Sequence, residues 1–156
     1  MELYNQPTQT GELVAVILRS VLSKFWTRAL PPGIDIITET TLRIGEYDFL
    51  EPDFIFWPES IQLKDLRAEH ILLLVEVADS SLSYDLGRKA QIYASLGIRD
   101  YWAINAVKMI THVHRLGDGD TYPDPVVVPH TGILTPQLLP ALAVRLADLG
   151  LEPMSA

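Results

Sequence analysis

The stretch Leu72–Trp102, LLLVEVADSSLSYDLGRKAQIYASLGIRDYW, opens on an apolar run that carries one carboxylate, Glu76, near its end. Continuous hydrophobicity from His70 to Ala78 is typical of a central strand that is covered on both faces. A carboxylate buried in such a strand is costly unless it is paired, hydrogen-bonded or bound to metal. The sequence therefore predicts that Glu76 has a specific partner.

The segment after this strand predicts where that partner comes from. Lys89 and Tyr93 are spaced four residues apart in a helical pattern, so they share one face of the expected helix. Within the strand, Glu76 and Ala78 point to the same side of the sheet because side chains alternate. Since Ala78 is small, it leaves space beside Glu76 that the ammonium group of Lys89 can fill.

The size of the chain suits one ordinary domain, which we expect to span residues 1–156. The chain has 156 residues, of which 48% are apolar, enough for a sizeable core. No apolar run approaches the roughly 18 residues needed to cross a bilayer, and the first residues lack the regions of a secretory signal. We therefore expect no membrane contact and a cytoplasmic location. The absence of cysteine excludes disulfides and thiolate metal sites.

The charge of the chain restricts the class of nucleic-acid protein it can be. Twelve basic and 20 acidic residues give a net charge of -8. Such a balance disfavours a protein that holds nucleic acid mainly by charge. It does not exclude an enzyme that acts on phosphodiesters, because a bound metal supplies positive charge locally.

The order of the expected elements predicts an α/β (α+β) fold with a mixed central sheet flanked by helices. We expect a first helix from Glu12 to about Trp26, capped by Thr10, and a second from Ser83 or Tyr84 to Leu96. A weak third helix is expected over Leu138–Leu149. Besides the buried strand, the expected strands are Ile34–Ile44, Asp53–Trp57, Asp100–Asn105, Met109–Arg115 and Val126–Val128.

Asp53, Glu76 and Lys89 together suit metal-assisted hydrolysis of phosphodiesters. Mg²⁺ prefers oxygen ligands and commonly takes one or two carboxylates while keeping several waters. The backbone carbonyl of Val77 is a candidate further ligand. Lysine can orient the attacking water or stabilise charge that develops in the transition state.

The same residues carry a family resemblance. It rests on Glu51-Pro52-Asp53, on the run Val75–Ser81, on Asp85-x-x-x-Lys89-x-x-x-Tyr93, and on Gly97-Ile98-x-x-Tyr101-Trp102. Together these resemble a large bacterial family that is abundant in cyanobacteria and belongs to the PD-(D/E)XK nuclease superfamily. Its members are known as "putative restriction endonucleases" or as a domain of unknown function.

The resemblance implies a restriction-endonuclease-like core, a Mg²⁺ or Mn²⁺ cofactor and a DNA substrate. Asp53 and Glu76 match the acidic metal ligands of the family. Lys89 matches a lysine that has moved from the strand to the next helix, which agrees with Ala78 at the usual lysine position. The chain departs from the family at its N-terminus, where most members have a further hairpin and helix.

Two other acids are candidates for the site, because the first helix of the superfamily often contributes one. Glu12 lies in the first turn of the expected helix, where it can equally stabilise the helix N-terminus. Glu39 lies on the expected strand Ile34–Ile44, where it can equally be a solvated residue. Tyr93, Tyr101 and Trp102 are expected in the core, and His112 and His114 on the surface of a strand.

Two functions remain open at this point. The first is a metal-dependent endonuclease that cleaves DNA, with Asp53, Glu76 and Lys89 in its site. The second is a catalytically inactive binding or assembly module that keeps the fold, in which Glu76 and Lys89 form only a buried salt bridge. Exposed strand edges and the apolar segment Leu138–Leu149 make a homodimer reasonable in either case.

Overall fold

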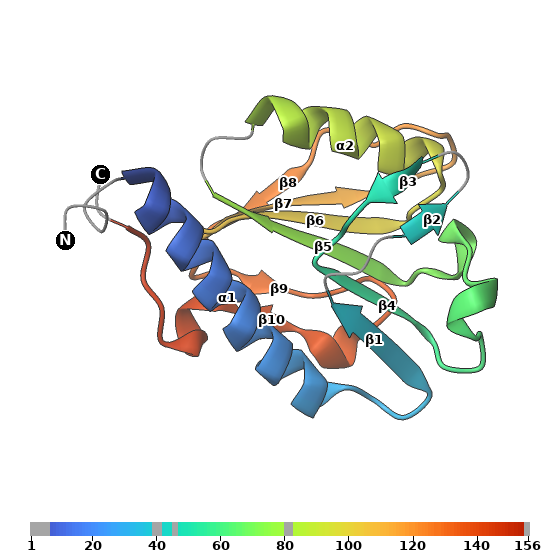
Figure 1. Cartoon of the computed structure of the whole chain (residues 1–156), viewed down its shortest axis with the longest axis horizontal. Helices are drawn as coiled ribbons and strands as arrows, with labels where there is room; N and C mark the ends of the chain where they lie inside the picture. Colours follow the sequence, from blue (N-terminus) through green and yellow to red (C-terminus); the bar gives the residue numbers. More distant parts are fainter. Residues whose placement is uncertain (1–6, 39–41, 45–46, 80–82, 155–156) are drawn as a thin grey trace.

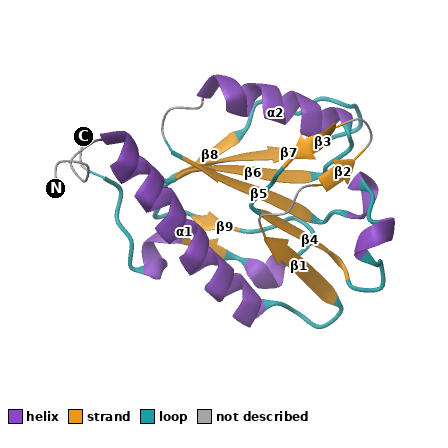
Figure 2. Cartoon of the chain, in the orientation of Figure 1, coloured by secondary structure: helices purple, strands orange, loops and turns teal. Residues whose placement is uncertain are grey.

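The computed structural model of the chain describes residues 7–38, 42–44, 47–79 and 83–154. Within these residues, a central sheet lies between two α-helices (Figure 1, Figure 2). The helices are α1 (Pro7–Ala29) and α2 (Ser83–Ser95). The predicted fold class, a mixed sheet flanked by helices, is confirmed.

The described sheet has six strands in the order β1-β4-β5-β6-β7-β8. β5 and β6 run parallel, with α2 connecting them, whereas the other neighbours are antiparallel. The predicted buried strand is therefore β5, in the middle of the sheet. The strands are β1 (Ile34–Thr38), β4 (Phe54–Pro58), β5 (Leu73–Ala78), β6 (Asp100–Asn105), β7 (Ile110–Arg115) and β8 (Val126–Val128).

Each face of the sheet has its own core, because side chains alternate along every strand. One core contains Leu18, Leu22 and Trp26 of α1, packed against side chains that include Phe54 and Val75. The other core contains Ala90 and Tyr93 of α2, packed against Ile55, Leu74, Tyr101 and Ala103. The predicted core positions of Tyr93, Tyr101 and Trp102 are confirmed, since all three are fully buried.

The first helix is longer than the sequence pattern predicts. α1 begins at Pro7, so Thr10 lies inside the helix and is not its cap. Proline is favoured at the first helical position because its missing N–H needs no partner there. The apolar stripe from Leu13 onward marks only the part of the helix that crosses the sheet, and this is why the prediction began at Glu12.

The expected strand Ile34–Ile44 is two strands in two sheets. β1 ends at Thr38, whereas β2 (Leu42–Ile44) pairs with β3 (Tyr47–Leu50) in a separate hairpin. Continuous β-branched composition predicts extended backbone but cannot show that the chain changes partner. Glu39 lies outside the described residues. Two short 3-10 helices, η2 (Leu63–Asp65) and η3 (Ala68–His70), connect β4 to β5.

The expected helix over Leu138–Leu149 is wrong. The segment contains η4 (Pro140–Leu142), β10 (Val144–Arg145) and η5 (Leu146–Leu149), and β10 pairs with β9 (Ile133–Leu134). Leu142, Val144 and Leu146 are buried at every second residue, which is the spacing of an extended chain. The segment packs beside α1 (Figure 1), where Trp26 Nε1 donates a hydrogen bond of 3.0 Å to the carbonyl of Leu142.

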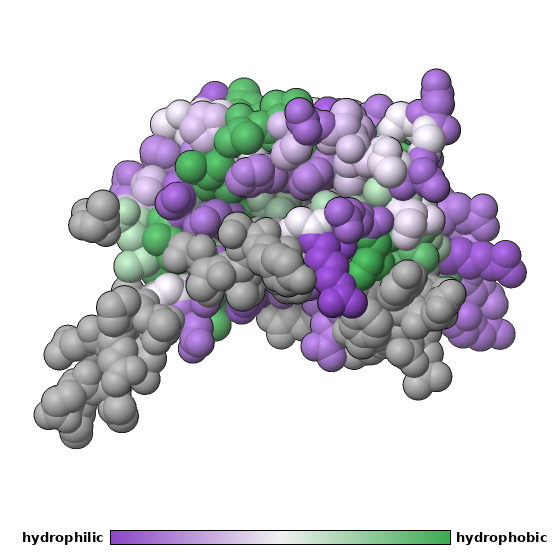
Figure 3. Space-filling model, turned by 90° about the horizontal axis from the view of Figure 1, so that it is seen from above, coloured by the Kyte–Doolittle hydropathy of each residue, from purple (hydrophilic) through white to green (hydrophobic). Residues whose placement is uncertain are grey.

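The surface is mostly hydrophilic on the side that carries α2, with an apolar patch among the polar side chains (Figure 3). Edge strand β8 exposes Val126 and Val127, and α1 exposes Leu13, Val16 and Ile17. None of the described helices is long and apolar enough to cross a membrane.

Candidate functional site

The site begins where β4 and β5 separate. Phe54 and Val75 are the last pair of the β4–β5 ladder, but β5 continues to Ala78. The N–H of Val77 therefore has no β4 carbonyl opposite it. Asp53, just before β4, accepts this N–H with Oδ2 at 2.7 Å. The carboxylate of Asp53 thus takes the place of a ladder partner and is fixed against the end of β5.

The carbonyl of Val77 points toward the same edge of β5 as its N–H, because both groups of a residue in an extended strand face one neighbour. The next carbonyl, that of Ala78, accepts from the N–H of Ala106 at 2.8 Å on the β6 side. The alternation places the carbonyl of Val77 on the side of Asp53. A backbone oxygen and a carboxylate therefore face the same gap between the strands.

Glu76 is almost fully buried and lies on the face of the sheet that α2 covers. Its Oε1 accepts a hydrogen bond from Nζ of Lys89 at 3.1 Å, and its Oε2 accepts one from the hydroxyl of Tyr93. Both partners come from α2, one helical turn apart, as the four-residue spacing predicts. The predicted contact between Lys89 and Glu76 is present.

Burial raises the pKa of Glu76, although Lys89 and the hydroxyl of Tyr93 oppose this effect by favouring the charged carboxylate. Burial also raises the pKa of Tyr93, and the neighbouring charge of Glu76 adds to the increase. Tyr93 therefore keeps its proton and acts as a hydrogen-bond donor. The site holds a carboxylate whose charge depends on two donors from α2.

Helix α1 approaches the same gap from the opposite face of the sheet. Nε of Arg19 lies 3.2 Å from Oδ1 of Asp53, with the side chain of Arg19 27% exposed. A Cβ atom at Gly11 would lie 3.4 Å from that of Asp79, so the start of α1 touches the segment just after β5. The gap between β4 and β5 thus lets side chains from both helices reach one site.

Arg19, Asp53, Glu76 and Lys89 line a cavity of about 420 Å³. Its described lining contains five acidic and two basic side chains, so the cavity carries an excess of negative charge. Such a cavity attracts cations and repels phosphates unless a cation is bound. The charged residues of the lining are Glu12, Glu51, Asp53, Glu76, Asp79, Arg19 and Lys89, and the others are Ala15, Val16, Val77 and Ala78.

The structure brings Asp53, Glu76, Val77 and Lys89 together in this cavity. Ala78 also lines the cavity, and its small side chain was expected to leave open space beside Glu76. Glu12 reaches the cavity with an exposed side chain. The other candidate acid, Glu39, falls outside the described residues.

The sequence prediction missed Arg19 and underrated Tyr93. Arg19 lies seven residues after Glu12, so both fall on one face of α1, and this spacing was the available signal. Tyr93 was expected only as a core residue, yet its hydroxyl holds Glu76. Glu51 and Asp79 flank the two predicted acids in the sequence, and the fold places both of them in the cavity lining.

The oxygen donors fit a hard divalent cation such as Mg²⁺, which commonly takes one or two carboxylates and completes its shell with water. Asp53, Glu76 and the carbonyl of Val77 supply only oxygen ligands. Among the described residues, no three histidine, aspartate or glutamate side chains converge closely enough to hold a metal on their own. The donor set therefore suits a partly hydrated ion.

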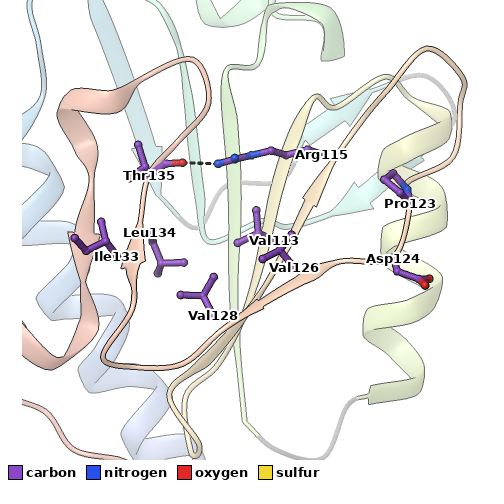
Figure 4. Close-up of a pocket in the computed structure, with 9 residues that line it drawn as sticks. All are labelled: Val113, Arg115, Pro123, Asp124, Val126, Val128, Ile133, Leu134 and Thr135. Atoms are coloured by element: carbon purple, nitrogen blue, oxygen red, sulfur yellow. Dashed lines mark hydrogen bonds between the residues drawn. The ribbon is translucent and has the colours of Figure 1, made fainter.

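Two other cavities in the described structure lack this combination of acids and bases. One, of about 260 Å³, is lined mostly by apolar side chains of β7, β8 and β9, and its Arg115 is bound to the carbonyl of Thr135 (Figure 4). The other, of about 610 Å³, lies between α2 and residues 120–125 and contains His114. His114, expected on the surface of a strand, is half-buried there and stacks on Tyr101, with ring centres 5.3 Å apart.

Comparisons with known proteins agree with the fold. The sequence profile of the Uma2 family, described as "Putative restriction endonuclease", matches residues 2–147. A similar solved structure is that of "a putative nuclease belonging to DUF820" from Anabaena variabilis. The two chains share 13% identity with a TM-score of 0.64, over 92% of this chain and 80% of that chain, so this likeness shows the fold alone. A search of curated protein sequences gave no match.

Proposed function

Because the chain belongs to the Uma2 family, described as "Putative restriction endonuclease", we propose that it is an endonuclease that hydrolyses DNA with Mg²⁺ or Mn²⁺. The observation that carries the proposal is the convergence of Asp53, Glu76 and Lys89 in one acidic cavity. These residues come from three separate segments of the chain, and they meet where two strands separate. Perturbed, buried ionisable groups that gather in a cleft are typical of functional sites.

In the proposed site, Asp53, Glu76 and the carbonyl of Val77 would hold the cation. When bound, a divalent cation lowers the pKa of water and neutralises charge on the phosphate. It would also offset the excess negative charge of the cavity, which otherwise repels DNA. The hydrogen bond from the Val77 N–H fixes Asp53, and the hydroxyl of Tyr93 fixes Glu76, so both carboxylates are oriented in advance.

The role that we propose for Lys89 is to stabilise charge. In hydrolysis, water loses a proton to solvent as its oxygen attacks phosphorus, and the bond to one ester oxygen breaks as that oxygen takes up a proton from solvent. Negative charge grows on the phosphoryl oxygens in the transition state. Lys89 lines the cavity and its side chain is 33% exposed beside Glu76, so its ammonium group can orient the attacking water or donate to such an oxygen.

The test combines cleavage with metal binding. Linear, supercoiled and single-stranded DNA are incubated with the wild-type protein and Mg²⁺ or Mn²⁺. Lys89→Ala should lower the cleavage rate by about 100-fold or more, the scale of a lost transition-state donor. The matched control Lys108→Ala, an exposed lysine outside the cavity, should cleave like the wild type. Equal rates for Lys89→Ala and the wild type would refute the assigned role of Lys89.

One observation favours the second candidate, an inactive binding or assembly module. Asp53 and Glu76 are each already paired with a basic side chain, so the cluster is satisfied without a metal. Calorimetry and thermal unfolding separate the two candidates. No heat from Mn²⁺ and no thermal shift on its addition would favour the inactive module.

Exposed β8 also supports the predicted homodimer, which light scattering after size-exclusion chromatography would test.

A further inference from the structure

Each oxygen of the two central carboxylates already contacts a group of the protein itself. Oδ1 of Asp53 faces Arg19 and Oδ2 accepts the N–H of Val77. Oε1 of Glu76 accepts from Lys89 and Oε2 accepts from Tyr93. Two negative charges thus face two positive ones within ion-pair distance. A divalent cation at this site meets the positive charges of the two bases, so its binding is opposed unless at least one of them moves away.

Arg19 is the base held less firmly. The ammonium of Lys89 makes a hydrogen bond to Glu76, whereas Nε of Arg19 is buried and makes no hydrogen bond to any described group. Nε of Arg19 nevertheless lies 3.2 Å from Asp53, so the attraction is that of a misaligned ion pair. Hydrogen bonds between charged groups are strong only when they are well aligned. The contact from Arg19 is therefore the easier one to displace.

Arg19 is also placed to meet a phosphate. It lines the same cavity as Lys89, but it comes from the opposite face of the sheet. Its guanidinium is planar and has five donors in a fork that matches two phosphate oxygens. Once a divalent cation neutralises the charge of Asp53, the attraction between Asp53 and the guanidinium of Arg19 weakens. An anionic group in the cavity then becomes its best partner.

We propose that Arg19 is an exchangeable counter-ion: it neutralises Asp53 in the metal-free site, competes with the divalent cation there, and binds the substrate phosphate once the cation is present. This inference rests on the proposed metal-dependent function and adds a step that couples metal loading to substrate binding. Without the cation, Arg19 is held by Asp53 and the acidic cavity repels DNA. With the cation, both obstacles to DNA binding are removed.

The exchange gives two effects of opposite sign in one variant. Arg19→Gln removes the competitor, so Mn²⁺ should bind about fivefold more tightly by calorimetry, equivalent to about 1 kcal/mol. The same variant removes a phosphate contact, so DNA should bind several-fold more weakly in fluorescence anisotropy with Ca²⁺ in place of Mg²⁺. Arg28→Gln removes an equal charge from the exposed side of α1 outside the cavity and should change neither affinity.

The outcomes separate the inference from the function on which it rests. Tighter Mn²⁺ binding together with weaker DNA binding supports the exchange. Unchanged or weaker Mn²⁺ binding by Arg19→Gln, with normal binding by the wild type, overturns it and makes Arg19 a residue that merely positions Asp53. No Mn²⁺ binding by the wild type overturns the proposed function as well. Arg19→Met, which keeps most of the apolar stem, provides the same readouts if the glutamine variant is unstable.

Discussion

Lys89 donates a hydrogen bond of 3.1 Å to Glu76 and so connects the middle of α2 to the end of the central strand β5. The side chain of Glu76 is only 6% exposed, whereas that of Lys89 is 33% exposed. Loss of the contact therefore costs Glu76 more than Lys89, because water can solvate the charge of Lys89 but not that of Glu76. This asymmetry has a measurable effect on stability.

Replacement of Lys89 by methionine should lower the free energy of unfolding by about 2 kcal/mol at pH 7, because Glu76 stays buried without its cation. Burial raises the pKa of Glu76, so the folded state favours the protonated acid and the cost exists only above that pKa. The cost of Lys89→Met, from urea unfolding, should therefore shrink as the pH falls to 4. The double variant Glu76→Gln/Lys89→Met should lose less stability than Lys89→Met alone. Additive costs would contradict this account.

Substitutions of Asp53 should affect the free energy of unfolding and the affinity for Mn²⁺ differently. Asp53→Asn keeps an oxygen for the N–H of Val77, so it should cost less than about 1 kcal/mol of unfolding free energy. Asp53→Ala leaves that N–H without its acceptor and should cost about 2 kcal/mol. Both variants should lose Mn²⁺ binding in calorimetry, since neither keeps the charged ligand. Retention of full Mn²⁺ affinity by both would remove Asp53 from the proposed metal site.

The sequence was sufficient to predict the contact between Glu76 and Lys89 because both belong to consecutive elements. Strand alternation fixes the face of Glu76, and helical periodicity fixes the face of Lys89. A strand and the helix that follows it usually pack together, because the connection between them is short. The contact between Glu76 and Lys89 could therefore be predicted without knowing how distant parts of the chain fold.

Helical spacing places Arg19 on the face of α1 that carries Glu12, but its contact with Asp53 could not be predicted in the same way. Its approach to Asp53 depends on where α1 crosses the sheet and on the place where β4 and β5 separate. Both are properties of the assembled fold. The misread segment Leu138–Leu149 has the same cause, because its apolar residues fit a helical stripe and an extended chain equally well. Its packing beside Trp26, 116 residues earlier than Leu142, decides the outcome.

Asp100 should be the most sensitive acid outside the cavity. It is fully buried and accepts from Trp102 Nε1 at 2.9 Å, from the N–H of Gln137 at 2.8 Å and from Arg115 at 3.4 Å. Asp100→Ala leaves these donors unsatisfied and should cost about 3 kcal/mol of unfolding free energy. Asp100→Asn keeps one acceptor and should cost less.

The matched control for Asp100 is Asp148, whose side chain is 66% exposed and whose carboxylate pairs with Arg145 at 3.5 Å. Exposed pairs contribute little, so Asp148→Ala should change the unfolding free energy by less than about 0.5 kcal/mol. Urea unfolding of the three variants beside the wild type makes the comparison. If Asp100→Ala and Asp148→Ala lose equal unfolding free energy, the three contacts of Asp100 do not contribute more to stability than an exposed ion pair.

His114 should make the protein less stable in mild acid. It packs against both Tyr101 and Tyr122, with ring centres 5.3 and 5.2 Å away, and its buried Nδ1 has no hydrogen-bond partner among the described residues. Burial lowers the pKa of His114, and the charge of His112 adds to the effect. The folded state thus favours the neutral ring, so stability is full above the ordinary pKa of about 6.5 and is lost as the pH falls below it.

The substitution His114→Phe tests this dependence, because phenylalanine keeps an aromatic ring against the two tyrosines but cannot take up a proton. Between pH 7.5 and pH 5.5, the wild type should lose more unfolding free energy than His114→Phe, as measured by urea titration at each pH. His112→Phe, on the same strand, should keep most of the wild-type loss. If His114→Phe and the wild type lose equal stability on acidification, protonation of His114 is not the cause, and the acid sensitivity belongs to other groups.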